Sequence, residues 1–451
     1  MSLGDKLKEK LNLPFVRNTL KLSSSSVVLM FLPLLVTPIL SRLYTPADYG
    51  DWGVFSSVFY IIIAFIFLSY ENTIVKSTNK EEVPNLVLLC LVVSLAAIFC
   101  VAVFFYGGMA LDVKFCKEFP SISLLLALLL AYVVHTIVSN LSNREKIYGK
   151  MAISSVINGV SQALFRIGFG VWPIVSYGLI VGNLLAHIVA SLFMAIFLIK
   201  VLDSNFFKSM SWKELRRLAV EYKKFPLFDA PARLIEFAIG NMALIIMTFF
   251  WSKDEIGSYS MIIQFILLPI TVVGSAMANV YYRELSETME QGGNIAVATK
   301  RAAKISFAVS LLPLLFLALG GDKLLVLFLG EQWMLAGKLS LCLVIYSVPV
   351  ILSEPLLPLF RALNKQEYRF KINLLCLILS IGGLMIAGYL TRNIYISVIV
   401  YSIFFALCRY LMYFTILKLA NLAMKEITSI FVVASVGGYL ILFARLLLEF
   451  F

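Results

Sequence analysis

The chain has 451 residues, of which 61% are hydrophobic and 14% are charged, and its formal net charge is +12. Soluble domains carry a charge on roughly 25% of their residues, and the mean hydropathy here is +0.92. This composition excludes an ordinary water-soluble protein, because such a chain could not hide its apolar surface from water. It indicates a protein that lies within a lipid bilayer.

Long apolar runs follow one another along the chain, and a helix needs about 20 such residues to cross a bilayer. The short alternating segments of a membrane barrel are not seen, so the sequence predicts an all-α integral membrane protein. The predicted spans are residues 20–43, 51–75, 84–107, 120–142, 150–172, 175–200, 226–250, 256–282, 303–329, 337–361, 369–390, 394–418 and 427–448. The last of these is an extra C-terminal helix, which leaves the number of spans at 12 or 13.

Lysine and arginine cluster in alternate loops between these runs, and 27 of the 38 basic residues fall on one side. The positive-inside rule places that side, with the N-terminus, in the cytoplasm. The net charge therefore reflects membrane topology and does not indicate a nucleic-acid partner. No small-residue cleavage site follows the first apolar run, which predicts an uncleaved first helix.

The longest segment between spans is basic and contains the amphipathic stretch SWKELRRLAVEYKKF. It divides the chain into two sets of six helices. The predicted parts are a cytoplasmic amphipathic N-terminus (1–18), an N-terminal lobe (19–200), a basic cytoplasmic linker (201–225), a C-terminal lobe (226–420) and an additional apolar helix (421–451).

A weak internal repeat supports this division. An offset of 207 residues places YTPADYGDWGVF (44–55) on WSKDEIGSYSMI (251–262), so that Gly50 meets Gly257. Both segments occupy the external turn between the first two helices of their half. The repeat predicts two lobes related by a pseudo-two-fold axis along the membrane normal, as in transporters that work by alternating access.

The loop after the second span, ENTIVKSTNKEEVPN, lacks the signature of the major facilitator superfamily. By contrast, SRLYTPADYGDWGVFSSVF (41–59), after a first helix with Pro33 and Pro38, resembles the polysaccharide transport branch of the multidrug/oligosaccharidyl-lipid/polysaccharide (MOP) exporter superfamily. The loops NREKIYGK and NKQEYRFK also resemble those before its helices five and eleven. The resemblance covers about residues 15–420.

The resemblance implies a Wzx-type flippase of a bacterial inner membrane. Such a protein would move an undecaprenyl-pyrophosphate-linked oligosaccharide, such as an O-antigen unit of lipopolysaccharide, from the cytoplasmic to the periplasmic leaflet. Polymerase and chain-length proteins of the same pathway would be its protein partners. The glycan is expected to sit in a hydrated, cationic cavity between the lobes, with the polyprenyl tail in lipid.

Charged residues inside spans are costly and usually functional. Guanidinium groups suit a pyrophosphate, so Arg166, Arg233 and Arg409 are predicted to bind substrate, with snorkelling or pairing to a carboxylate as the alternative. Lys21 and Arg42 flank the first span. They are candidates for substrate contact or for anchoring at the membrane interface.

Three carboxylates are predicted to couple transport to H⁺ or Na⁺: Asp229, Glu236 and Glu354. The first two share a helical face with Arg233, which fits either a cavity lining or a structural ion network near the interface. Glu354 lies among prolines, where it would serve ion coupling or cap freed backbone amides. Glu71 is predicted to be interfacial.

The sequence shows no P-loop and no catalytic constellation, and its two histidines, His135 and His187, fit packing or a proton relay. The six cysteines have no metal-ligand spacing. We therefore expect a transporter without enzymatic activity, metal or cofactor. The alternatives are a multidrug/cation antiporter of the same superfamily and a membrane enzyme of glycan assembly.

Overall fold

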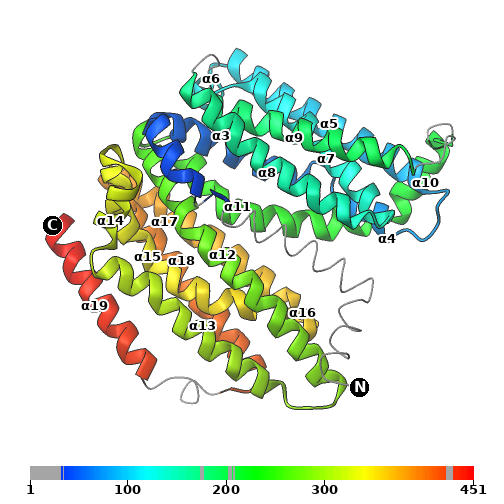
Figure 1. The fold of residues 1–451 in the computed structure, drawn as a ribbon. Coiled ribbons are helices and arrows are strands. Elements are labelled where there is room, and N and C mark those ends of the chain that lie inside the picture. Colours follow the sequence, from blue (N-terminus) through cyan, green and yellow to red (C-terminus); the bar gives the residue numbers. More distant parts are fainter. Residues whose placement is uncertain are drawn as a thin grey trace, which may run out of the picture. The chain divides into compact units, whose positions relative to one another are not determined.

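The structure, a computed structural model, describes residues 32–33, 35–172, 177–201, 206, 209–422 and 430–450. Within these residues every regular element is a helix (Figure 1), which confirms the all-α class. Most of the first predicted span, including Lys21, lies outside the described part of the chain. The same holds for the predicted N-terminal segment 1–18.

Eight of the described helical segments are long and apolar enough to cross a membrane. They are Val83–Ala110, Ile122–Arg144, Gly178–Leu198, Phe225–Met247, Ile295–Ala318, Glu331–Ala362, Gln366–Thr391 and Ile394–Leu419. Each overlaps a predicted span. Helices α3, α8, α12 and α19 lie at four further predicted spans but are not among the eight.

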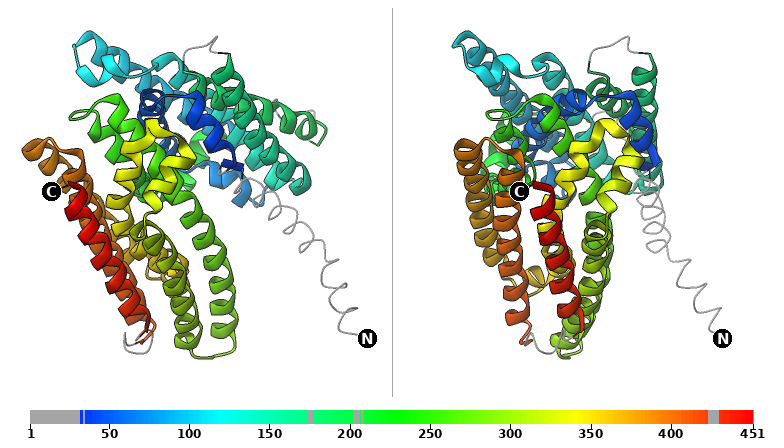
Figure 2. Two further views of the ribbon diagram at one scale, coloured as in Figure 1. Left: turned by 60° about the vertical axis from the view of Figure 1, so that its left-hand side comes forward. Right: turned by 90° about the vertical axis from the view of Figure 1, so that its left-hand side faces the viewer.

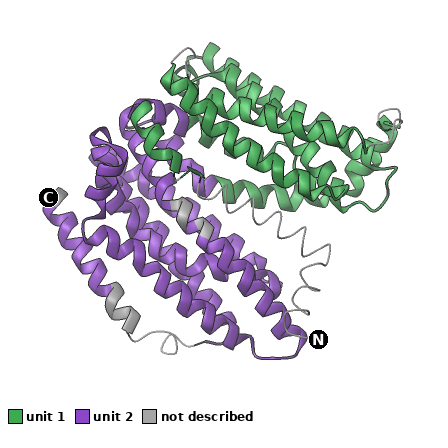
Figure 3. Ribbon diagram, in the orientation of Figure 1, with its two compact units in different colours: residues 1–44, 54–237 green, residues 45–53, 238–451 purple. Residues whose placement is uncertain are grey.

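The described chain forms two compact units (Figure 3). Unit 1 comprises residues 1–44 and 54–237. Its helices are most of α3 (Pro46–Phe65), α4 (Glu71–Lys76), α5 (Val83–Ala110), α6 (Lys114–Glu118), α7 (Ile122–Arg144), α8 (Tyr148–Val171), α9 (Gly178–Leu198), α10 (Trp212–Glu221) and the first part of α11 (Ala230–Met247). The most extensive packing in this unit is that of α9 against α8 and α7.

Unit 2 comprises residues 45–53 and 238–451. Its further helices are α12 (Lys253–Glu290), α13 (Ile295–Ala318), α14 (Gly321–Leu329), α15 (Met334–Ser353), α16 (Pro358–Ala362), α17 (Gln366–Thr391), α18 (Ile394–Leu419) and α19 (Ile430–Phe450). Helix α15 is the core of this unit, because it packs on α12, α13 and α18 and is buried over most of its length. The C-terminal helix α19, red in Figure 2, runs along α13.

Two predicted spans are interrupted. The span predicted over 51–75 breaks between α3 and α4, where Leu68 and Ser69 take positive φ angles of 50° and 62°. The span predicted over 303–329 ends at Ala318, and Gly320 turns the chain at a φ of 109° before α14 begins. Glycine reaches that region at little cost, whereas Leu68 and Ser69 are held there by the surrounding fold.

The repeated turn has the same local structure in both copies. Thr45 and Asp48 bond reciprocally, with Thr45 Oγ1 donating to Asp48 Oδ2 at 2.7 Å and Asp48 N donating back at 3.3 Å. Ser252 and Glu255, 207 positions later, form a capping box with distances of 2.8 and 3.4 Å. Each pair fixes the start of its helix, α3 or α12.

The two copies of this turn also pack on each other within unit 2. A Cβ on Gly257 would meet the carbonyl of Pro46 and would lie 2.8 Å from the amide nitrogen of Gly50. A Cβ on Gly50 would lie 3.0 Å from the carbonyl carbon of Lys253. Since Pro46 and Lys253 are counterparts in the repeat, as are Gly50 and Gly257, the contact is reciprocal. The arrangement of whole lobes predicted from the repeat stays a prediction.

Candidate functional site

In unit 1, Arg233 of α11 forms an ion pair with Glu71, the first residue of α4. The Glu71 side chain is 7% exposed and that of Arg233 is 32% exposed. The helix break at Leu68 and Ser69 turns the chain just before Glu71 and so sets the direction in which α4 leaves. The sequence interpretation of Glu71 as a merely interfacial residue therefore missed a buried partner of Arg233.

The other charged residues of the predicted α11 face lie nearer the surface. Asp229 ends a π-helical turn, Phe225–Asp229, and is exposed, as is Glu236. Pro226 occupies the beginning of this turn, and proline cannot donate the backbone hydrogen bond of a regular helix. The predicted coupling roles of Asp229 and Glu236 stay predictions.

Arg166 lies in the seam between α8 and α9. Its Nε donates to the Leu179 carbonyl at 3.1 Å, and its own carbonyl accepts a hydrogen bond from the Tyr44 hydroxyl at 2.7 Å. The two helices approach closely at Gly182, where a Cβ would lie 2.8 Å from Arg166 Cγ. The missing side chain of Gly182 makes room for the arginine stem.

A line of polar side chains continues from this seam into the middle of unit 1. We call it the polar stripe, and its members are Gln162 of α8, Asn183, His187 and Ser191 of α9, and His135 of α7. Gln162 donates to Asn183 Oδ1 at 2.6 Å, and His135 Nδ1 lies 3.2 Å from Ser191 Oγ. The two imidazole centroids are 5.5 Å apart. The sequence showed two separate histidines, because their proximity depends on how α7 packs on α9.

In unit 2, Arg409 of α18 pairs with Glu354, and the distance from Nη1 to Oε2 is 3.4 Å. Glu354 starts a 3₁₀ turn, Glu354–Leu356, which interrupts the helix after α15. The Arg409 guanidinium also lies 5.4 Å from the centroid of the Phe405 ring, within the range of a cation–π interaction. The fold thus brings a predicted binding residue and a predicted coupling residue into contact.

The remaining predicted substrate residue, Arg42, is exposed and donates through Nη1 to the Pro38 carbonyl at 2.8 Å. This bond lies within its own helical segment, so it shows neither a substrate contact nor an interface role. Lys21 is not among the described residues.

A second buried ion pair in unit 2 was not predicted. Arg445 of α19 binds Asp322 of α14 through both of its terminal nitrogens, at 2.9 and 3.1 Å, and also donates to the Leu317 carbonyl at 2.7 Å. The Asp322 side chain is 7% exposed. A signal was present in the sequence, because a single arginine stands within the apolar run 427–448.

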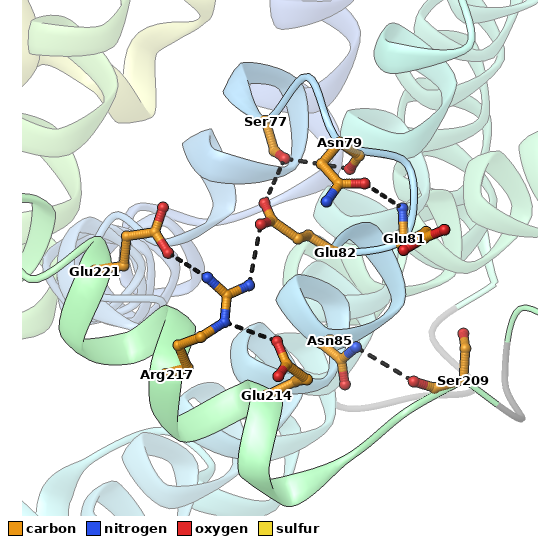
Figure 4. A network of polar contacts seen from close by, with 9 residues as sticks. All are labelled: Ser77, Asn79, Glu81, Glu82, Asn85, Ser209, Glu214, Arg217 and Glu221. Atoms are coloured by element: carbon orange, nitrogen blue, oxygen red, sulfur yellow. Dashed lines mark hydrogen bonds and ion pairs between the residues drawn. The ribbon is translucent and has the colours of Figure 1, made fainter.

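Outside the apolar spans, Arg217 of α10 binds three carboxylates (Figure 4). They belong to Glu82, Glu214 and Glu221, at 3.0, 2.8 and 2.8 Å. Burial alone would raise the pKa of Glu82, but hydrogen bonds from Arg217 and Ser77 lower it below its ordinary value. Arg217 thereby fastens α10 to the start of α5.

The described residues contain no group of three or more histidine, cysteine or acidic side chains placed to hold a metal ion. The recurring chemistry of the spans is instead that of arginine–carboxylate pairs and neutral hydrogen-bonding side chains. This arrangement suits binding of an anionic or hydroxyl-bearing ligand.

A family model described as "Polysaccharide biosynthesis protein" matches residues 39–337, about two thirds of the chain. Among curated proteins, none matches it. The fold is similar to that of the lipid II flippase MurJ in an inward closed conformation, with a TM-score of 0.70 and 12% identity over 95% of this chain and 93% of that one.

Two transporters of the MOP superfamily are also similar in fold. An inward-facing multidrug resistance MATE family transporter has a TM-score of 0.66 and 15% identity over 89% of this chain and 96% of that chain. A MOP superfamily transporter from Pyrococcus furiosus has a TM-score of 0.56 and 17% identity over 90% and 95%. The chain therefore belongs to the polysaccharide biosynthesis protein family, and it is a multi-pass membrane protein with the MOP transporter fold.

Proposed function

We propose that this protein flips a polyprenyl-pyrophosphate-linked oligosaccharide, such as an O-antigen or similar surface polysaccharide unit, from the cytoplasmic to the periplasmic leaflet of a bacterial inner membrane. Transport would proceed by alternating access, with the N-terminus in the cytoplasm. The observation that carries the proposal is the match of residues 39–337 to a polysaccharide biosynthesis family in a chain with the fold of a lipid II flippase.

The ion pair between Arg409 and Glu354 supports a role for both residues in transport. Charge-assisted N–H···O bonds usually measure about 2.7–2.9 Å, so the 3.4 Å separation of this pair is long. A pyrophosphate presents several anionic oxygens and competes well for a guanidinium. When the substrate takes over Arg409, Glu354 loses its counter-charge and gains affinity for H⁺ or Na⁺.

The same exchange applies to Arg233 and Glu71 in unit 1. Substrate phosphate on Arg233 would release the Glu71 carboxylate, which is 7% exposed and would then favour a proton or cation. Asp229 and Glu236 lie on the same helix and are proposed as further sites of ion coupling. Arg166 is proposed as a further residue that contacts the pyrophosphate during transport, with Lys21 and Arg42 as contacts near the membrane surface.

A multidrug/cation antiporter is the alternative that the MATE-like fold raises. The family match favours the glycan substrate, because that family is described by polysaccharide biosynthesis. A membrane enzyme of glycan assembly would cause defects in chain length or ligation, without accumulation of lipid-linked units on the cytoplasmic side. These outcomes separate the three functions.

The cellular test replaces the three span arginines, using R166Q, R233Q and R409Q together. In cells that lack the native gene, this variant should reduce surface glycan and cause lipid-linked units to accumulate at the cytoplasmic leaflet. The control carries the same loss of charge at exposed positions near helix ends, as K365Q, K371Q and K418Q, and should export normally. Normal export by the arginine variant at equal protein abundance would refute these binding residues.

A further inference from the structure

The polar stripe contains two imidazoles near the middle of their helices. His187 is nine residues from the start of α9, and His135 is nine residues from the end of α7, which places each about 14 Å from that helix end at 1.5 Å per residue. Asn183, His187 and Ser191 are spaced four residues apart and so share one face of α9. Polar groups at this depth are expensive in lipid and are usually retained for function.

The hydrogen bonds of the stripe determine the tautomer of His187. Its Nδ1 lies 3.0 Å from the Asn183 carbonyl oxygen. A carbonyl oxygen can only accept a hydrogen bond, so Nδ1 carries the hydrogen. In the neutral ring, Nε2 then holds a lone pair.

His135 also carries its hydrogen on Nδ1. The Ser191 hydroxyl donates its one hydrogen to the His187 carbonyl at 2.6 Å. Towards His135 Nδ1, 3.2 Å away, Ser191 must therefore act as the acceptor, and Nδ1 of His135 also carries the hydrogen. Both imidazoles consequently present an Nε2 lone pair.

Neither lone pair is used within the described structure. No donor in the described residues reaches Nε2 of His135 or His187, and neither atom is among the side-chain atoms that are buried without a partner. Both histidines are half-buried, so a ligand can approach their rings. The Tyr132 ring, with its centroid 6.3 Å from that of His187, provides an aromatic face beside them.

The charged groups around the two imidazoles favour binding of a neutral hydrogen-bond donor over binding of a cation. Arg166 on α8 acts electrostatically on His187, and Arg233 on α11 and Glu71 on α4 act on Tyr132. A second positive charge that feels the Arg166 guanidinium is unfavourable, and two imidazoles are too few for a tetrahedral metal site.

We propose that Nε2 of His135 and Nε2 of His187 accept hydrogen bonds from hydroxyl groups of the carbohydrate during its passage. The inference rests on the proposed function and assigns the part of unit 1 that recognises sugar, apart from the arginines that recognise pyrophosphate. Tyr132 packs against a sugar ring, as amphipathic aromatic rings do.

The test measures binding of two lipids to the full chain in nanodiscs. One lipid is polyprenyl pyrophosphate bearing the glycan, and the other is the same polyprenyl pyrophosphate without sugar. The double variant H135F/H187F should bind the glycan lipid about tenfold to a hundredfold more weakly, the effect of two lost neutral hydrogen bonds. The affinity of this variant for the sugar-free lipid should stay within about twofold of the native affinity, because the residues proposed to contact the pyrophosphate are unchanged.

The variant H135Q/H187Q is the matched control, because the glutamine carbonyl restores an acceptor, and it should keep most of the affinity for the glycan lipid. Equal weakening of both lipids by H135F/H187F would show a structural role and overturn the inference. Unchanged binding of the glycan lipid by H135F/H187F would also overturn the inference. The same holds if H135F/H187F binds the glycan lipid normally but its transport no longer depends on a pH gradient. If the native protein bound neither lipid, the proposed function itself would fail, which is a distinguishable result.

Discussion

Gly50 and Gly257 face each other where the first turns of α3 and α12 cross, and a Cβ on Gly257 would lie 2.8 Å from the Gly50 amide nitrogen. The two residues are counterparts in the internal repeat. Since residues 45–53 belong to unit 2 while the rest of α3 belongs to unit 1, α3 is continuous across the boundary of the units. The close crossing anchors the beginning of α3 in unit 2.

Gly257→Ala is expected to destabilise the protein, because its Cβ would meet the Pro46 carbonyl and the backbone there cannot move away freely. Overpacking of this kind costs about 1–3 kcal/mol or more, against a gain in helix propensity of at most about 1 kcal/mol. Thermal unfolding in detergent measures the effect. The control is Gly240→Ala in α11, where a Cβ meets nothing within 4 Å; equal stability of the two variants would contradict the close crossing.

In the ion pair of Arg233 and Glu71, we expect loss of the arginine to destabilise the protein more than loss of the carboxylate. Arg233→Gln leaves a carboxylate that is 7% exposed without its counter-charge, at a cost of about 3–5 kcal/mol. Glu71→Gln leaves an arginine that is 32% exposed and can reach water, so the loss should be smaller. Thermal stability of the two variants, with the exposed Asp229→Asn as control, tests this order, and a reversed order would contradict it.

Arg445 and Asp322 are expected to hold α19 against the rest of unit 2. Either R445Q or D322N alone should destabilise by about 3–5 kcal/mol, because one buried charge is left unpaired. The double variant R445L/D322L should recover much of this loss, since apolar side chains of similar volume replace the pair. A double-mutant cycle of unfolding free energies measures the coupling, and additive losses would show that the two residues act independently.

The attachment of α10 to α5 is expected to depend on pH through Glu82. Its folded pKa lies below the ordinary value of 4.5, so the unfolded segment binds a proton more readily than the folded one. The stabilisation is therefore present above pH 4.5 and is lost as the pH falls through the lower folded pKa. The protection of residues 212–221 against hydrogen exchange, relative to the intrinsic exchange rate at each pH, should fall in that range, and in Arg217→Gln it should already be low at neutral pH.

Sequence periodicity and hydrophobicity were sufficient to predict the approximate positions of the long helices among the described residues, because a membrane span must be an apolar helix. They were not sufficient for the break at Leu68 and Ser69. Neither residue is a glycine or proline, and the positive φ angles there depend on the packing around the chain. The Gly320 break carried a local signal, since a Gly-Gly pair ends the apolar run.

For the predicted site residues, the partners seen in the structure were only partly predictable from the sequence. Arg409 pairs with the carboxylate of Glu354, which was the alternative interpretation of this arginine. Arg233 pairs with Glu71, which lies far from it in the sequence. Which carboxylate meets which arginine depends on helix packing across 162 positions in the latter case, and no local pattern encodes that. The proximity of His135 and His187 escaped prediction for the same reason.

The most direct test of the account is translocation by the purified protein in sealed vesicles. Polyprenyl-pyrophosphate-linked glycan is placed in the outer leaflet, and its loss of access to a membrane-impermeant glycosidase is followed with time. We predict that vesicles with the native protein protect the glycan much faster than vesicles with the R166Q/R233Q/R409Q variant or with no protein. Equal protection rates in all three would contradict the assignment as a lipid-linked glycan flippase.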